Sequence, residues 1–238
     1  MEHLVPSTGS VVANRLLADL PSRDRQHLTA GCERVELACA DILGEPGERI
    51  RHVYFPAESF ISLAAPVDGR ASLEVGLIGN EGMVGIPLIL GIGVSPQRTL
   101  VRGSGSALRM TAASFNRELA ASAALHRMLN RYLYALMAQF AQTAACTRFH
   151  LLDARLARWL LMTHDRAHSD SFHLTHDFLA DMLGVRRVGI TKAAGALQRR
   201  KLISYRRGHI TIIDRAGLEA VSCGCYLAMK HTYDRIVR

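Results

Sequence analysis

The chain has 238 residues, 49% of them hydrophobic and 21% charged, as in a soluble globular protein. Five cysteines at irregular spacing argue against a disulfide framework, and the most apolar stretch, residues 85–94, is too short and too interrupted to span a membrane. The net charge of +8 is concentrated near the C-terminus: residues 150–238 hold 15 basic and 8 acidic side chains, against 14 and 13 in residues 1–149. This asymmetry predicts a polyanionic partner, and the lack of a signal peptide predicts a cytoplasmic protein with no membrane partner.

The N-terminal part contains short helical runs followed by a strand-rich region. Residues 11–30 are helical in pattern, with Pro21 at a plausible first turn. Between residues 32 and 110, short segments of alternating polarity are separated by the turn sequences GEPGE, VDGR and GNEG. Short strands at this spacing indicate an antiparallel barrel or roll.

A stretch of about forty residues without glycine or proline follows from Thr111. Its apolar stripe has helical steps of three and four and consists of Leu125, Leu129, Tyr132, Leu133, Leu136, Met137, Phe140 and Ala144. A helix of ~30 residues would be ~45 Å long, too long for one small domain to cover. We therefore expect the stripe to meet a second copy, giving a homodimer through residues 121–149. The alternative is two shorter helices with a bend near Ser122.

The C-terminal region begins with an amphipathic helix in residues 151–167, followed by a helix, a turn and a second helix. Thr175 is a suitable N-cap for the helix before the turn, and Gly184 can end that helix in left-handed geometry. The second helix, from about Arg186, has an apolar face of Ile190, Ala193, Ala194 and Leu197 and a basic opposite face. Two short strands, LISY and HITII, flank the tight turn RRGH.

This pattern matches a winged helix-turn-helix, in which the second helix enters the DNA major groove. An arginine can bond guanine O6 and N7 together, and the other basic side chains suit phosphates. Gly189 would allow a close approach to DNA or to the partner helix. The predicted DNA-binding residues are Arg186, Arg187, Val188, Gly189, Thr191, Lys192, Arg199, Arg206 and Arg207. The alternative for these residues is a solvated basic face of a small helical domain.

The order of a strand-rich domain, a long helix and a winged helix-turn-helix resembles the Crp/Fnr family of bacterial transcription regulators. The resemblance implies an α+β fold: an N-terminal antiparallel, cyclic-nucleotide-binding-like β-roll in residues 1–112, a dimerisation helix in 113–150 and a DNA-binding domain in 151–238. It also implies a palindromic operator and, for an activator, RNA polymerase as a partner. Val188 stands where the family commonly has a glutamate, so the operator is expected to differ from the usual half-site.

The resemblance also implies an effector pocket in the roll. Its candidate residues are Gly82, Gly85, Arg98 and Thr99. Ile86 follows Gly85 where the family has the glutamate that bonds the ribose hydroxyl, and losing that acceptor weakens binding of a cyclic nucleotide. A different small molecule, or none, is the favoured prediction, and no cofactor is assigned.

Other candidate chemistry is weaker. Cys223-Gly-Cys225 is a pair without a second pair, so no metal site is predicted there. A dense group of histidines comprises His164, His168, His173 and His176, in a connecting segment where polar residues are expected anyway. No nucleophile elbow, paired-carboxylate motif or Walker loop is present, so an enzyme is not predicted. The alternative function is a sensor subunit, binding a cyclic nucleotide or another small ligand, whose basic domain binds an acidic partner other than DNA.

Overall fold

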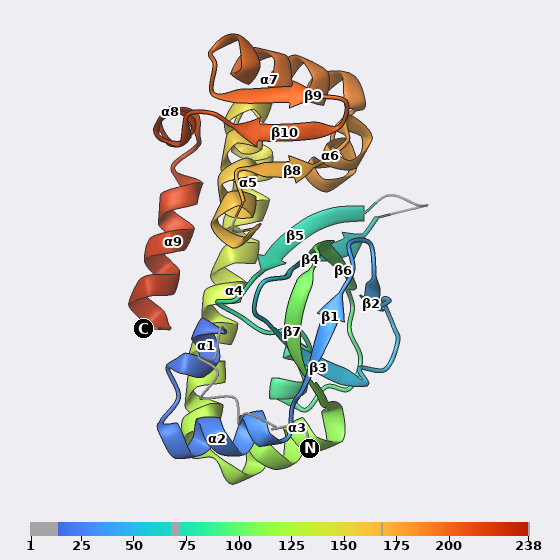
Figure 1. Ribbon diagram of the computed structural model, residues 1–238, viewed down its shortest axis with the longest axis vertical. Coiled ribbons are helices and arrows are strands. Elements are labelled where there is room, and N and C mark those ends of the chain that lie inside the picture. The colour runs from blue at the N-terminus through green and yellow to red at the C-terminus, as the bar shows by residue number, and fades with distance from the viewer. Residues whose placement is uncertain (1–13, 68–71, 168, 238) are drawn as a thin grey trace, which may run out of the picture.

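The computed structural model describes residues 14–67, 72–167 and 169–237 (Figure 1). The elements are, in chain order, α1 (Arg15–Ala18), α2 (Ser22–Ala30), β1 (Glu33–Leu37), β2 (Ile42–Gly44), β3 (His52–Pro56), β4 (Phe60–Pro66), β5 (Ser72–Ile78), the 3-10 helix η1 (Ile86–Leu90), β6 (Arg98–Gly103), β7 (Gly105–Thr111), α3 (Ala112–Ala121), α4 (Ala123–Phe149), α5 (Leu152–Ala167), β8 (Ser171–His173), α6 (His176–Leu183), α7 (Arg187–Arg199), β9 (Ile203–Arg206), β10 (His209–Ile212), α8 (Arg215–Val221) and α9 (Cys225–Ile236). No described helix is both long and apolar enough to cross a membrane.

The N-terminal strands form two antiparallel sheets, ordered β1-β7-β3 and β2-β6-β4-β5. Apolar residues from both sheets, among them the fully buried Phe55 and Ile61, form a core shared with α4. The predicted α+β fold, with a β-roll, a long helix and a winged helix-turn-helix, is confirmed.

The long helical stretch is divided at Ser122, as the alternative with a bend there predicts. The Ser122 side chain caps α4 by accepting a hydrogen bond from the Leu125 N–H at 3.0 Å, so α3 ends and α4 begins at this residue. The prediction that the whole apolar stripe meets a second copy is wrong, since several members are buried against the roll of the same chain. These members are Leu125, Leu129, Tyr132 and Leu136.

A second core lies in the C-terminal domain, where α5, α6 and α7 pack against the sheet β8-β10-β9. Trp159, Leu160 and Ile190 are nearly or completely buried in it. Strand β8 was not predicted, because three residues are too few to show a period. It pairs with β10 and makes the wing a three-stranded sheet.

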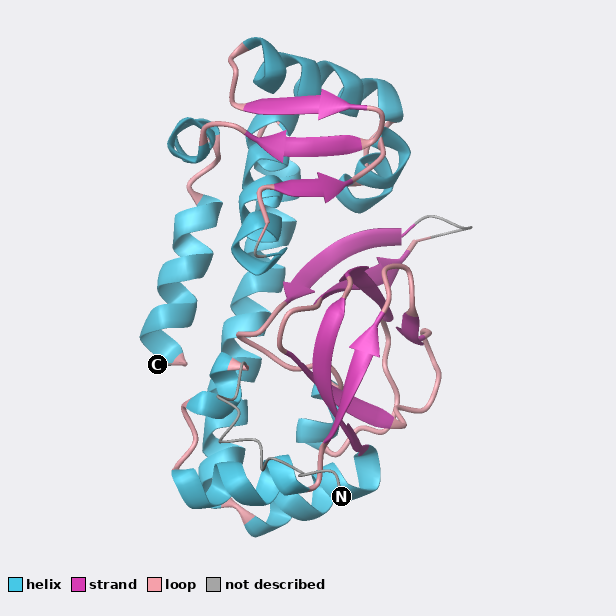
Figure 2. Cartoon of the chain, viewed as in Figure 1, coloured by secondary structure: helices cyan, strands magenta, loops and turns pink. Residues whose placement is uncertain are grey.

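The chain then returns toward the roll, which the sequence did not predict. Helix α9 leaves the winged domain and runs beside α4 (Figures 1 and 2). At its far end, the Tyr233 hydroxyl donates to the backbone carbonyl of Glu81, in the roll. The C-terminal helix therefore connects the winged domain, the long helix and the roll.

Candidate nucleic-acid interface

The helix-turn-helix is built by local signals in the sequence. Thr175 caps α6, with its hydroxyl oxygen accepting from the Phe178 N–H at 3.2 Å. Gly184 ends the helix at φ 62°, a left-handed conformation that glycine adopts without strain. The next residue, Val185, donates its N–H to the Ala180 carbonyl at 2.9 Å, which closes the turn before α7.

Helix α7 has one buried face and one exposed face. The buried side chains are those predicted from the period: Ile190, Ala193, Ala194 and Leu197. The exposed side chains include Arg186, Arg187, Val188, Thr191, Lys192 and Arg199. Val188 is 60% exposed at the start of α7, so its side chain is accessible to a partner.

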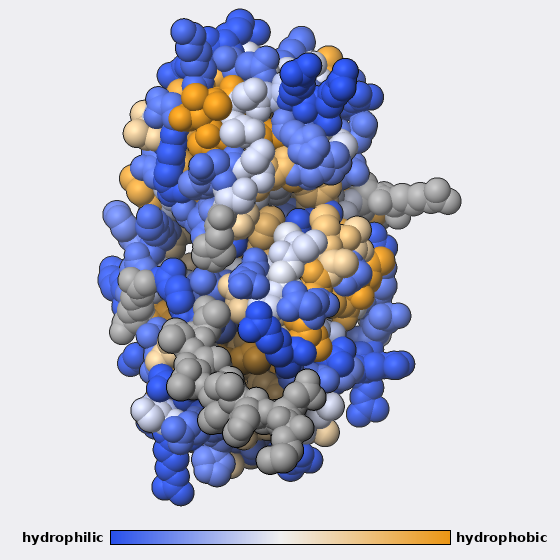
Figure 3. All heavy atoms as spheres, in the orientation of Figure 1, coloured by the Kyte–Doolittle hydropathy of each residue, from blue (hydrophilic) through white to orange (hydrophobic). Residues whose placement is uncertain are grey.

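The charge on this face is largely uncompensated. Residues 186–207 contain eight basic side chains and no acid. Arg187 has an ion pair with Asp177 at 3.4 Å, but both side chains are about two-thirds exposed, so the pair contributes little. On the side shown in Figure 3, the end of the molecule that carries α7 and the wing is mostly hydrophilic.

In the wing, strands β9 and β10 form a hairpin with a two-residue turn. Arg207 at φ 49° and Gly208 at φ 80° both have left-handed geometry, as a type I′ turn requires. Arg206 and Arg207 are exposed at this turn. The Tyr205 N–H donates to the Gln198 side chain at 2.7 Å, which fixes the wing against the end of α7.

His176 connects α6 to both α7 and the wing. Its ring stacks on Tyr205 with centroids 4.2 Å apart and planes 14° apart, and its Nδ1 lies 3.0 Å from the Thr191 hydroxyl. Burial, followed by the nearby Arg187, lowers the pKa of His176. Thr191 also donates to the Arg187 carbonyl, so its hydroxyl is already engaged within the protein.

Gly189 faces the interior of the domain. A methyl group at this position would lie 3.0 Å from Cδ2 of Leu152, at the start of α5. The close approach that this glycine permits is therefore between α7 and α5. This neighbour is α5 and not α6, the partner of α7 in the helix-turn-helix, and the approach of Gly189 to DNA stays a prediction.

The winged domain is docked on the roll through a polar contact. The indole N–H of Trp159 donates to a Glu74 carboxylate oxygen at 2.7 Å, with both residues buried. Burial raises the pKa of Glu74. On the same side, the Arg102 guanidinium lies 4.1 Å from the ring centre of Phe178 and bonds Met182, both on α6. We call Glu74, Arg102 and Trp159 the joint.

The predicted effector residues are only partly brought together. Gly85 and Thr99 line a pocket of about 380 Å³ in the roll. Arg98 instead pairs with Glu45 at 2.8 Å. Gly82 packs against Tyr132, where a side chain would collide with the phenol ring.

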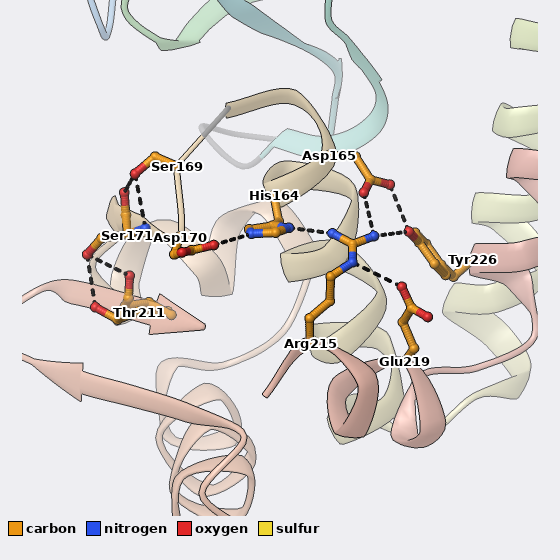
Figure 4. A network of polar contacts seen from close by, with 10 residues as sticks. His164, Asp165, Ser169, Asp170, Ser171, Thr211, Arg215, Glu219 and Tyr226 are labelled. Carbon is orange, nitrogen blue, oxygen red and sulfur yellow. Dashed lines mark hydrogen bonds and ion pairs between the residues drawn. The ribbon is translucent and has the colours of Figure 1, made fainter. Parts of the chain in front are cut away.

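The histidines of the connecting segment serve hydrogen bonding. His164 lies between Asp170, at 2.6 Å, and Arg215, which also bonds Asp165, Glu219 and Tyr226 (Figure 4). His173 contacts His209, and His168 lies outside the described residues. Within the described chain, these histidines do not form a group of three or more metal donors.

The described residues instead bring together a different set of donors. Cys146 and His150, near the end of α4, supply the second pair that Cys223-Gly-Cys225 lacks in the sequence. The sequence did not predict this group, because its halves are more than seventy residues apart. Two signals were available: the pair Cys223-Gly-Cys225, and the spacing of Cys146 and His150 by four residues at the end of α4.

The fold and this surface define a β-roll protein with a winged helix-turn-helix. The family model of the Crp-like helix-turn-helix domain matches residues 154–221. No curated protein matches the chain in sequence.

Solved structures show the same fold over most of the chain. A Crp/Fnr-family protein from Eubacterium rectale is 16% identical with a TM-score of 0.68, over 88% of this chain and 98% of its own. FixK2 of Bradyrhizobium japonicum is 12% identical with a TM-score of 0.68, over 81% and 98%. The c-di-GMP-responsive regulator CLP of Xanthomonas campestris is 15% identical with a TM-score of 0.63, over 81% and 99%. The chain thus carries a Crp-like helix-turn-helix domain on the fold of Crp/Fnr transcriptional regulators, and the predicted resemblance is confirmed.

Proposed function

We propose that the protein is a sequence-specific transcription regulator that binds a palindromic operator as a homodimer. The observation that carries this proposal is the exposed basic face of α7 and the wing, which has eight basic groups and no acid between residues 186 and 207. A helix of this kind fits the major groove, with its N-terminal residues at the base edges. Arg186 and Arg187 supply guanidinium groups there, and Lys192, Arg199, Arg206 and Arg207 supply phosphate contacts.

The dimer is supported by an exposed stripe on α4, distinct from the buried one. It has steps of four and three and consists of Asn130, Tyr134, Met137, Ala141 and Ala144. Tyr134 is 57% and Met137 60% exposed, and the alanines would let a second helix approach closely. Phe149 and Leu151, 77% and 83% exposed at the end of α4, extend the apolar surface toward the winged domain.

Control by a signal would act through the docking of the winged domain on the roll. Because the joint and α4 both contact the roll, a ligand that binds one arrangement better would shift the position of α7. The pocket beside Gly85 and Thr99 is the candidate effector site. Glu45, which lines this pocket, forms an ion pair with Arg98. Because this arginine is then not available to bind a phosphate, we favour an effector other than a cyclic nucleotide. RNA polymerase is the further partner if the regulator activates.

The test is binding to genomic DNA followed by footprinting of the bound fragments. Two protected half-sites about one helical turn apart, with two-fold symmetry, are the expected result. Arg187→Ala should weaken binding to that site by roughly ten-fold or more while the dimer persists in sedimentation. Arg23→Ala, an exposed arginine on α2 at the opposite end of the molecule, is the control and should bind normally. No protected sequence, together with capture of an acidic protein, would favour the alternative of a sensor subunit.

A further inference from the structure

Three cysteines and one histidine meet where the long helix ends. Cys146 and His150 lie one turn apart at the end of α4 and just after it, and Cys223 and Cys225 flank the turn between α8 and α9. Their sulfur and nitrogen donor atoms all lie within 4.8 Å of one another. The Cys146 and Cys223 sulfurs are 3.4 Å apart, and the Cys225 sulfur is 3.4 Å from Nδ1 of His150.

These distances fit a single tetrahedral ion. With metal–sulfur bonds of about 2.3 Å and metal–nitrogen bonds of about 2.0 Å, two sulfurs lie about 3.8 Å apart and a sulfur and a nitrogen about 3.5 Å apart. A disulfide between Cys146 and Cys223 would need the sulfurs to approach to about 2.05 Å. A disulfide between these two cysteines would also not explain why Cys225 and His150 lie beside them. The four donors therefore fit a metal ion better than they fit a disulfide.

The surroundings suit a negatively charged metal centre. Three thiolates around a divalent ion carry one excess negative charge, and burial of that charge requires a counter-charge. Arg155 and Arg158 on α5 are both buried and close enough to interact electrostatically with Cys146. The Gln142 side-chain amide donates to the Cys225 sulfur at 2.9 Å, which is the kind of hydrogen bond that orients a metal ligand.

We propose that Cys146, His150, Cys223 and Cys225 bind one Zn²⁺ ion in a Cys3His site. Three sulfurs and an imidazole are the donors that zinc prefers, and four protein ligands make a closed, structural site. Cys146, Cys223 and Cys225 are 0%, 7% and 2% exposed, while His150 is exposed and offers a path by which the ion can enter.

The site would fix the C-terminal helix to the long helix. Between Phe149 and Leu152 the chain passes from α4 to the winged domain. Helix α9 begins beside this connection, at Cys225, and runs from there toward the roll. An ion held by α4 and by the turn before α9 closes a loop between the two segments. Its occupancy would therefore set how firmly the winged domain is held relative to α4. This inference does not depend on which molecule the winged domain binds.

The experiment measures metal directly in reduced full-length protein. Purified protein incubated with Zn²⁺ and then desalted should retain one zinc per chain by elemental analysis. Co²⁺ in place of Zn²⁺ should give the intense visible bands of a tetrahedral thiolate site. Cys223→Ser should abolish both signals, and Cys39→Ser, which removes an exposed cysteine in the roll, should change neither.

A second variant covers the case in which Cys223→Ser fails to fold. His150→Ala removes an exposed ligand, so the fold should persist by circular dichroism while the affinity for Zn²⁺, measured by competition with a chelator, falls by more than about ten-fold. A chelator should lower the melting temperature of the wild type and leave that of His150→Ala nearly unchanged. Failure of the reduced wild type to retain Zn²⁺ or Co²⁺, or equal loss in Cys39→Ser, would overturn the proposal. So would a visible iron–sulfur spectrum.

Discussion

The surface of α7 and the joint between the two domains both contain charged side chains, but they use them in opposite ways. On α7 the arginines are exposed, come from one short segment and have almost no acidic partners. At the joint, Trp159 and Glu74 are buried, come from positions 85 residues apart, and are joined by a hydrogen bond from the indole N–H to one carboxylate oxygen. The first arrangement leaves charge available for a molecule outside the chain, and the second uses it to hold the chain together.

Because of this difference, we expect variants on α7 to change DNA affinity and variants at the joint to change stability. Exposed charges on α7 contribute little to folding, so removing one should change affinity for DNA and leave stability alone. A buried polar group that loses its partner costs folding free energy directly. The comparison therefore fails if variants at the two regions have interchangeable effects.

The largest expected effect is at the joint. Glu74→Ala leaves the Trp159 N–H without an acceptor and removes the carboxylate beside Arg102 and Arg158, so we expect the free energy of unfolding to fall by about 3 kcal/mol. Urea denaturation measures this. Glu36→Ala, which removes an exposed carboxylate, should stay within about 0.5 kcal/mol of the wild type. Equal stability of the two variants would show that the joint does not hold the domains.

At Val188 the expected effect is on base preference. Val188→Glu provides an acceptor for cytosine N4 at the start of α7, and each such contact is worth about 1–3 kcal/mol of discrimination. Selection from random DNA should show one changed position in each half-site. Val188→Ala, which shortens the apolar side chain without adding an acceptor, should not gain the new preference. Identical selected sequences for all three proteins would place Val188 away from the bases.

Arg206 in the wing should affect affinity without affecting sequence. Arg206→Ala is expected to weaken binding to all DNA sequences alike and to reduce the slope of log K against log salt by about 0.9 for each phosphate that the protein no longer neutralises. Titrations at several salt concentrations, on operator and on unrelated DNA, measure both quantities. A weakening confined to the operator would instead mean that Arg206 reads a base.

The sequence predicts the α7 surface well because all its signals are local. The Thr175 cap, the Gly184 turn and the period of Ile190 through Leu197 lie within one short stretch, and the structure confirms each of them. The joint and the group of Cys146, His150, Cys223 and Cys225 could not be predicted in this way. Their members are separated by many residues, and only the tertiary fold brings them together.

The long helix is a third case, in which the helical pattern is confirmed but part of the apolar stripe is covered by the roll of the same chain. Leu125, Leu129 and Leu136 have the expected helical spacing, but the period of an apolar stripe does not say what covers it. The roll of the same chain covers these residues, while Met137, a member of the predicted stripe, is exposed together with Tyr134.

The smallest expected effect is a pH dependence at His176, which shares features of both regions. It is partly buried and bonded within the domain, yet it faces the same segment as the exposed arginines. Burial and Arg187 lower its pKa below the ordinary 6.5, so the folded state favours the neutral ring. The stability from this effect is therefore present above pH 6.5 and is lost as the pH falls, because the unfolded chain takes up the proton first.

Between pH 7.5 and 5.5 the wild type should lose slightly more thermal stability than His176→Gln, and NMR titration of the His176 ring should give a pKa below 6.5. A raised pKa would mean that Asp177 outweighs Arg187, so that the exposed acid, and not burial, sets the charge of this residue.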